Sequence, residues 1–254
     1  MSRYRASFIH LVISTLLVSN VIAIVFWIWY PKPAFEVAGA FSIISLLIAV
    51  DLVLGPLLTL IVYKHGKPGL KFDLSVIAIV QIAALVYGTY VLYTEKPSYL
   101  VFAVDRIEFV SGNHIDHSAI RYEELKKKRF AKLTPVFARL PEEPKEYERF
   151  FDSIIFEGKA DLERRAEYWE PWAAGADLIR QKITSIEDIE PESADEKQNV
   201  QRAMDEYAES HPNLGVIPVG GTEKDIGLLV DRDTLEILDV LAADPWPKKS
   251  VSVF

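Results

Sequence analysis

The stretch AVDLVLGPLLTLIVYKHGKPGLKF, residues 49–72, places an aspartate and a Gly-Pro pair inside an apolar run that ends in a basic loop. Asp51 is the only charged residue between Val37 and Tyr63. A charged side chain at the centre of a membrane helix costs about 2.5–3.5 kcal/mol on insertion scales, so such residues face protein and not lipid. The stretch therefore raises two questions: whether the run spans a membrane, and what Asp51 contacts there.

Three apolar runs precede Glu95, and each is long enough to cross a membrane. They contain 23, 27 and 20 residues and cover positions 8–30, 37–63 and 74–93. At a rise of 1.5 Å per residue, about 20 helical residues cross a hydrocarbon layer of about 30 Å. The first run continues to bulky aromatic residues, past the roughly 7–15 apolar residues of a secretory signal, so we interpret it as a retained helix. The sequence predicts a three-helix transmembrane domain in residues 1–94.

The distribution of Lys and Arg predicts the orientation of these helices. Arg3 and Arg5 precede the first run, and the loop between the second and third runs contains Lys64, Lys67 and Lys71, whereas the first loop contains only Lys32. Basic residues are enriched in cytoplasmic loops. We therefore expect the N-terminus and the loop between the second and third runs in the cytoplasm, and an extracytoplasmic domain in residues 95–254.

The part of the chain after Thr94 has the composition of an acidic soluble domain. It contains 22 of the 28 Lys and Arg residues and 33 of the 36 Asp and Glu residues, a net charge of −11. That balance argues against a nucleic-acid partner, for which a basic stripe is expected. The chain has no cysteine, which excludes disulfides, thiol catalysis and thiolate metal sites.

Hydrophobic periodicity predicts an α+β fold with an antiparallel sheet for this domain. We expect strands in 98–112, 133–141 and 215–221, and a hairpin in 224–246 that turns at 231–234. Helices are predicted for 118–130 and 144–158, and the pattern stays largely helical from 160 to 211.

Four stretches together resemble the TfpX/TfpZ family of type IV pilin accessory proteins: DLVLGPLLTLIVYK (51–64), YTEKPSYLVFAVDRIEFV (93–110), EYWEPW (167–172) and LVDRDTLEILDVLAADPW (229–246). The resemblance implies a bacterial inner-membrane accessory protein whose domain in residues 95–254 is periplasmic. Its implied role is that of a pilin-specific chaperone or modulator of type IV pilus assembly and of the balance between extension and retraction. Its expected partners are the major pilin, other inner-membrane pilus components and membrane lipid. No enzymatic activity or cofactor is implied. The alternative is a membrane-tethered sensor or binding protein for an envelope ligand.

An intramembrane aspartyl peptidase is the enzymatic alternative, because the chain has Asp51 and Asp73. Such chemistry requires two carboxyl groups close enough to share a proton. Asp73 lies at the cytoplasmic edge of the third run, and the two residues differ in depth by roughly 15 Å or more at the helical rise. A shared catalytic site is therefore not expected.

A polar layer is predicted inside the membrane. Counted from the cytoplasmic ends, Asn20, Asp51 and Gln81 lie within about 6 Å of one level, and Pro56, which has no N–H, leaves the carbonyl of Leu52 without its helical donor. Asn20 and Gln81 can then donate to Asp51 and hold the helices together, which is the interpretation that we favour. The alternative is that the layer is a docking point for the membrane helix of the pilin, whose N-terminus brings an amine.

The aromatic cluster of Tyr168, Trp169 and Trp172 allows two interpretations. Large aromatic residues anchor interfaces, but they also dominate the cores of small domains, and we favour the core. The segment DRDTLE (231–236) lacks the glycine and the spacing of a calcium loop, and the pair His114 and His117 lies in a polar loop. Neither predicts a metal site.

Overall fold

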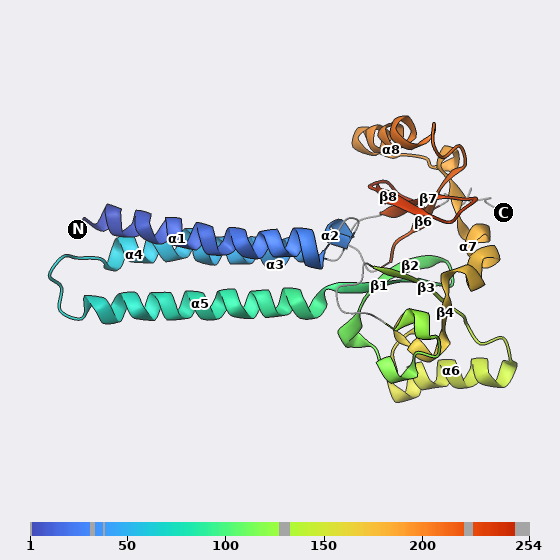
Figure 1. Ribbon diagram of the computed structural model, residues 1–254, viewed down its shortest axis with the longest axis horizontal. Coiled ribbons are helices and arrows are strands. Elements are labelled where there is room, and N and C mark those ends of the chain that lie inside the picture. Colours follow the sequence, from blue (N-terminus) through green and yellow to red (C-terminus); the bar gives the residue numbers. More distant parts are fainter. Residues whose placement is uncertain (1, 31–33, 38, 127–132, 221–225, 247–254) are drawn as a thin grey trace, which may run out of the picture. The chain divides into compact units, whose positions relative to one another are not determined.

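A computed structural model describes residues 2–30, 34–37, 39–126, 133–220 and 226–246 (Figure 1). The chain divides into two units. The helical unit comprises residues 1–31 and 39–96, and the C-terminal unit comprises residues 32–38 and 97–254.

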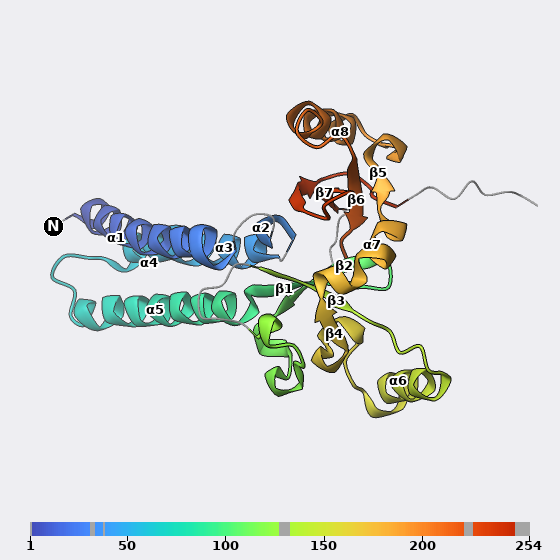
Figure 2. The same ribbon diagram turned by 45° about the vertical axis from the view of Figure 1, so that its right-hand side comes forward.

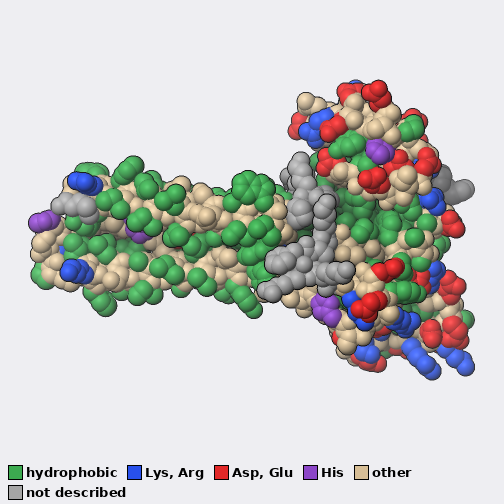
Figure 3. Space-filling view, in the orientation of Figure 1, with side chains coloured by type: hydrophobic (Ala, Val, Ile, Leu, Met, Phe, Trp, Pro, Cys, Tyr) green, Lys and Arg blue, Asp and Glu red, His purple; other side chains and the backbone are tan. Residues whose placement is uncertain are grey.

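Three long helical spans build the helical unit over its described residues. Their bounds are Arg3–Trp29, Ala40–Val62 and Leu70–Glu95, and each is long and apolar enough to cross a membrane. Their outward side chains are largely hydrophobic (Figure 3). The first span consists of α1 (Arg3–Ile24) and a π-helical turn (Val25–Trp29). The second consists of α3 (Ala40–Ile48), a π-helical turn (Ala49–Leu54) and α4 (Gly55–Val62). The third is α5 (Leu70–Glu95).

The first and third spans meet at their aromatic ends. The hydroxyl of Tyr30 donates to the carbonyl of Leu92 at 3.0 Å, and the Tyr30 side chain is buried. The rings of Trp29 and Tyr93 pack edge to face with their centroids 5.3 Å apart. These contacts join the C-terminal ends of the two spans, so α1 and α5 run in the same direction.

In the part of the C-terminal unit that the structure describes, two four-stranded sheets form the centre. Their strand orders are β2-β1-β3-β4 and β5-β6-β7-β8. The strands are β1 (Pro97–Ala103), β2 (Arg106–Ser111), β3 (Thr134–Ala138), β4 (Trp169–Pro171), β5 (Thr184–Ser185), β6 (Leu214–Pro218), β7 (Gly227–Asp231) and β8 (Ile237–Leu241). The helices are α2 (Ala34–Val37), α6 (Pro144–Glu157), α7 (Ala176–Lys182) and α8 (Ala194–Tyr207).

The described residues of the C-terminal unit form three hydrophobic cores, because successive side chains of a strand point to opposite faces of its sheet. Strand β1 is buried on both faces, so Tyr99 and Val101 pack on the side of α6 while Leu100 and Phe102 pack between the two sheets. A third core lies on the other face of the second sheet, where strand residues such as Leu229 pack with α8. The order of layers is therefore α6, first sheet, second sheet and α8, as Figures 1 and 2 show.

Capping residues explain why α6 begins and ends near the positions predicted from the sequence. The carboxylate of Glu143 accepts from the N–H of Glu146 at 3.0 Å, and Pro144 occupies the first turn. Gly158 follows the helix with a φ of 66°, a left-handed conformation that glycine adopts without steric cost. The predicted helix over 144–158 is confirmed, and so is the hairpin β7–β8.

Three predictions about the C-terminal unit need correction. The first sheet is mixed, because β1 and β3 are parallel, although all other strand pairs in the described sheets are antiparallel. The helix predicted for 118–130 is wrong over its described part, which forms two short 3-10 turns, His117–Ala119 and Glu123–Leu125; positions 127–130 lie outside the described residues. Within 160–211, only α7 and α8 are α-helical.

Candidate functional site

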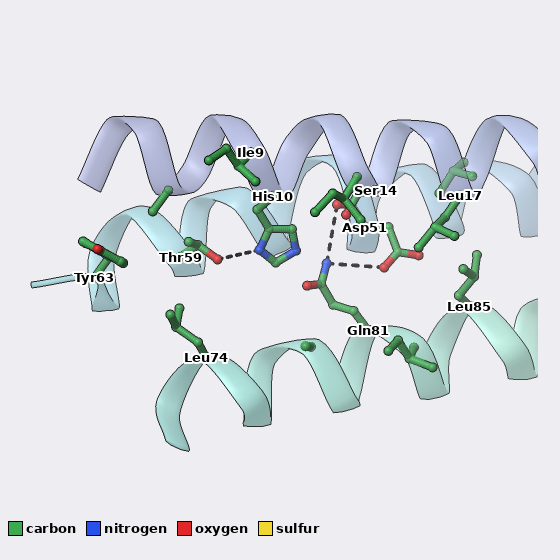
Figure 4. Close-up of a pocket in the computed structure, with 15 residues that line it drawn as sticks. Ile9, His10, Ser14, Leu17, Asp51, Thr59, Tyr63, Leu74, Gln81 and Leu85 are labelled. Carbon is green, nitrogen blue, oxygen red and sulfur yellow. Dashed lines mark hydrogen bonds between the residues drawn. The ribbon is translucent and has the colours of Figure 1, made fainter. Parts of the chain in front are cut away.

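The side chains of Asp51 and Gln81 meet inside the helical unit. Both residues are buried, with 3% and 7% of their surface exposed. The amide nitrogen Nε2 of Gln81 donates to Oδ1 of Asp51 at 3.3 Å and lies 3.4 Å from the carbonyl oxygen of the same residue (Figure 4). It also lies 3.4 Å from the carbonyl oxygen of Val50. One amide of α5 thus binds the second span at the place where that span is irregular.

The irregularity is the π-helical turn that precedes Pro56. The N–H of Gly55 donates to the carbonyl of Val50, five residues back, and Pro56 has no N–H to continue the pattern. In this register, the N–H that Pro56 lacks would have donated to the carbonyl of Asp51. The regular α-helical register expected from the sequence would instead leave the carbonyl of Leu52 without its donor. Gln81 approaches the Asp51 carbonyl.

Gly55 makes that approach possible. A Cβ atom at this position would overlap the amide group of Gln81. Glycine therefore opens the face of the second span on which the side chain of Gln81 lies, next to the carbonyls exposed by the π-helical turn.

A second set of polar contacts joins the first span to the second. Nδ1 of His10 and Oγ1 of Thr59 are 2.6 Å apart, and the hydroxyl of Ser7 donates to the carbonyl of Pro56 at 2.8 Å. Ser14 lies one turn beyond His10 and is buried. His10, Ser14 and Thr59 were not predicted from the sequence. The signal for His10 and Ser14 was the spacing of polar residues at positions 7, 10 and 14, which places them on one face of the first helix.

A cavity of about 310 Å³ with mostly aliphatic walls is lined by the polar side chains of His10, Ser14, Asp51, Thr59 and Gln81. The first span contributes residues from Ala6 to Val18, the second Asp51, Thr59 and Tyr63, and the third Leu74 to Leu85. Figure 4 shows His10, Asp51 and Gln81 pointing toward the space between the spans. Among the described residues, the buried side-chain atoms without a hydrogen-bond partner are Oδ2 of Asp51 and Oε1 of Gln81.

Asn20 lies apart from this cavity. Its side chain is exposed, and Nδ2 donates to the carbonyl of Leu16 on its own helix at 2.7 Å. The prediction that Asn20 donates to Asp51 is wrong. Pro56 is buried and shapes the layer through the backbone, as described above.

The aromatic cluster of the C-terminal unit belongs largely to its core. Trp169 is fully buried, its Nε1 donates to the carbonyl of Glu163 at 3.1 Å, and its ring lies 4.7 Å from that of Tyr99. Trp172 is half-buried and donates to the carbonyl of Leu235 at 3.3 Å. Tyr168 is half-buried against Phe150. Trp169 therefore presents no surface to a partner.

A polar groove of about 550 Å³ lies beside this cluster. Its central cation, Arg139, forms a two-nitrogen contact with Glu170 at 2.8–3.0 Å and also donates to the carbonyl of Ala174. The hydrogen bonds that Arg139 donates to Glu170 raise the pKa of Arg139. Because this cation is already paired, the groove offers an anion no free charge at Arg139.

The described residues contain no group of three His, Asp or Glu side chains that could hold a metal ion. His117 contacts the carbonyl of Gly112 at 2.8 Å, and Asp116 accepts from Ser118. In the DRDTLE segment, the carboxylate of Asp231 accepts from the backbone N–H groups of Asp233 and Thr234. These side chains have local structural partners.

Comparison with known proteins places the chain in a family. Residues 1–39 match the family model described as fimbrial assembly protein FimB. The fimbrial assembly protein of serogroups C1 and C2 from Dichelobacter nodosus is 33% identical over 114 residues, which cover 44% of this chain and 86% of the relative. The chain belongs to the FimB family of fimbrial assembly proteins. Two other fimbrial assembly proteins from the same organism, of serogroups I and E1, are 34% and 33% identical over 114 residues.

The match to these last two relatives spans only 44% of the length of each. No solved structure matches the chain. The FimB model covers the first span, which includes His10 and Ser14 of the cavity described above.

Proposed function

We propose that the chain is an inner-membrane accessory protein of type IV pilus biogenesis that acts by binding a pilin and not by catalysis. Its membership in a family of fimbrial assembly proteins supports a role in pilus biogenesis. The resemblance to TfpX/TfpZ supports the finer role of a pilin-specific chaperone or modulator of extension and retraction.

The observation that carries this proposal is the buried pair of Asp51 and Gln81, with one oxygen atom on each lacking a partner. Ionisable residues inside membrane spans are costly, and they mark functional sites by default. A scaffold that only holds its own helices together gains nothing from unsatisfied buried acceptors. A protein that receives a further membrane helix needs such acceptors.

Proteolysis by an aspartyl dyad is not part of the proposal. Asp73 is partly exposed and pairs with Lys67 at 2.6 Å, whereas Asp51 pairs with Gln81. Gln81 lies eight residues after Asp73 on α5, a rise of about 12 Å. This separation supports different roles for the two carboxyl groups.

The proposed orientation has a cytoplasmic N-terminus and a periplasmic C-terminal unit, as the Lys and Arg distribution indicates. Alkaline phosphatase is active only in the periplasm. We expect high activity from a fusion after Pro97 and background activity from a fusion at Gly66, each normalised to the amount of fusion protein. The reverse pattern would overturn the orientation.

Pilin binding is tested by purifying the full chain from its native host in mild detergent. We expect the major pilin to co-purify with it, and we expect deletion of the chain to reduce surface pili. Restored pili in a deletion strain that also lacks the retraction motor would assign the role to the balance of extension and retraction. Normal piliation without the chain, together with no captured pilin, would contradict the proposed function and favour an envelope sensor.

A further inference from the structure

A lateral groove lies between α1 and α5. The two helices pack on the second span, and the cavity at Asp51 is lined by all three. Its rim on α1 consists of Ile9, Ile13 and Leu17, which are 42–53% exposed, and Ile82 of α5 is 56% exposed. Residues spaced by four lie along one helix face. The cavity is therefore bordered by side chains that face outward from the helical unit.

The chemistry inside the groove calls for a hydrogen-bond donor. Oδ2 of Asp51 and Oε1 of Gln81 are acceptors without partners, although both side chains are more than nine-tenths buried. The Nε2 group of Gln81 is already directed at Asp51, and Nδ1 of His10 is engaged with Thr59. A buried carboxyl group is stabilised most by a cation that also donates hydrogen bonds. An ammonium group has three donors and no acceptor.

The depth of the groove indicates what must carry this ammonium group. Asp51 lies twelve residues from Tyr63, a rise of about 18 Å in a hydrocarbon layer of about 30 Å. Lipid headgroups remain near the surface of that layer, and an aliphatic wall disfavours a free hydrated ion. An amine at this depth has to be presented by another membrane helix.

The space also fits a helix. The cavity of about 310 Å³ is twice the size of one that accepts a benzene ring, about 150 Å³, so it accommodates side chains from a neighbouring helix. Four-helix bundles build polar sites from inward side chains of facing helices. A fourth helix in the groove would cover the exposed rim of α1 and α5.

We propose that the groove between α1 and α5 receives a partner transmembrane helix that presents an ammonium group to Asp51 and Gln81 at mid-membrane depth. This inference rests on the proposed function, in which the partner helix is that of a pilin. It adds the location of the contact and the chemical group that is recognised.

The test uses the full chain in lipid nanodiscs and a fluorescent polyleucine helix of about 22 residues. One peptide has a single central lysine, and its matched control has glutamine there. We expect the lysine peptide to bind at least about tenfold more tightly than the glutamine peptide, since tenfold corresponds to the upper part of measured polar couplings between membrane helices. In the Asp51→Asn variant this preference should disappear.

Two pairs of variants separate docking from a general loss of structure. Asp73→Asn removes a carboxylate outside the groove and should keep the preference for lysine. Ala78→Phe fills the groove without changing Asp51 and should weaken binding of the lysine peptide about tenfold, whereas Ala83→Phe, on the same helix but outside the cavity lining, should not.

Equal binding of both peptides, or an undiminished preference in Asp51→Asn, would overturn the ammonium site. Undiminished binding in Ala78→Phe would overturn the groove, even if Asp51→Asn proves too unstable to measure. Each of these results leaves the proposed function standing if the major pilin still co-purifies with the wild-type chain. The separate result that would contradict the proposed function is normal piliation without the chain together with no captured pilin.

Discussion

Replacing Trp169 by alanine is expected to lower the free energy of unfolding of the C-terminal unit by about 3–5 kcal/mol. Trp169 is fully buried and belongs to the core between the first sheet and α6. The substitution removes its contact with Tyr99 and leaves a cavity that the surrounding strands can fill only partly. Its Nε1 also donates to the carbonyl of Glu163, so that acceptor loses its partner.

Urea unfolding of the full chain in detergent, followed by near-ultraviolet circular dichroism, measures this loss as a lower transition midpoint. Trp169→Phe keeps an aromatic ring and should lose less than Trp169→Ala. Phe156→Ala is the matched surface control, because Phe156 on α6 is 79% exposed and should change the free energy by less than about 0.5 kcal/mol. Equal midpoints for Trp169→Ala and Phe156→Ala would show that Trp169 is not a core residue.

The elements with a clear period were predictable from the sequence. The three spans follow from the length of uninterrupted apolar sequence, and α6 follows from apolar residues at three-four spacing between Pro144 and Gly158. The hairpin follows from two strand-like segments around the turn that begins at Asp231. In each case local sequence and tertiary burial favour the same structure.

The helix expected at 118–130 shows where local signals are insufficient. Pairs of Glu and Lys at helical spacing contribute only a few tenths of a kcal/mol each. The buried residues Ile120 and Leu125 are five positions apart and do not form a helical stripe. Asp116 also accepts from the N–H and hydroxyl of Ser118, which stabilises a short turn. Burial of two separate side chains therefore decided the local conformation.

Sheet partners could not be read from the sequence either. Tyr99 of β1 pairs in parallel with Thr134 of β3. This pairing requires that β3 lies on the opposite side of β1 from β2, which local sequence does not specify. The presence of two sheets follows from packing, since β1 and β3 bury one face against α6 and the other against β6 and β7. A strand that is buried on both faces shows no alternation of polar and apolar residues.

For the candidate site, the sequence predicted the level of each residue along its helix better than the direction of its side chain around the helix axis. Counting residues places Asp51 and Gln81 near one level, and they do meet. The same count placed Asn20 there, but at about 100° per residue Asn20 lies about 240° around the helix from Ser14. His10 and Ser14 differ by only about 40° and both line the cavity. The direction of each side chain around α1 thus separates the cavity residues from Asn20.

The sequence also did not predict the π-helical turn. In this turn the N–H of Gly55 donates to the carbonyl of Val50, so the carbonyl without a helical donor belongs to Asp51 and not to Leu52. The Gly-Pro pair signals an irregular helix, but the pair is compatible with several hydrogen-bond registers. The register becomes visible only when Gln81 of another helix is placed against it.

Replacing Asp231 by alanine is the second large effect that we expect, a loss of about 2 kcal/mol in the free energy of unfolding at neutral pH. The side chain is 8% exposed and uses both oxygen atoms. Oδ1 accepts from the N–H groups of Asp233 and Thr234 at 2.9 and 2.8 Å, and Oδ2 accepts from Nδ1 of His211 at 2.9 Å. In Asp231→Ala, the N–H groups of Asp233 and Thr234 in the β7–β8 turn lose their acceptor, and so does His211 in the segment before β6.

The loss should shrink in acid, and the pKa of Asp231 gives the direction. The backbone N–H of Thr234, followed by His211 and the N–H of Asp233, lowers this pKa to about 2 in the folded chain. An unfolded aspartate has a pKa of about 3.9. The ionised carboxylate therefore stabilises the folded state fully above about pH 4, and this contribution disappears as the pH falls toward about 2.

Urea midpoints of the wild-type chain and of Asp231→Ala, measured between about pH 7 and pH 2.5, should converge at the acidic end. Asp239→Ala is the matched control, because Asp239 lies on β8 in the same hairpin, and its carboxylate accepts from the Val240 N–H and from Tyr207 without capping the turn. That variant keeps Asp231 and its three donors in place. A difference between wild type and Asp231→Ala that stays constant over the whole range would mean that the charge of Asp231 does not stabilise the turn. In that case, only the size and polarity of the side chain would matter, and Asp231→Asn would be as stable as the wild type at pH 7.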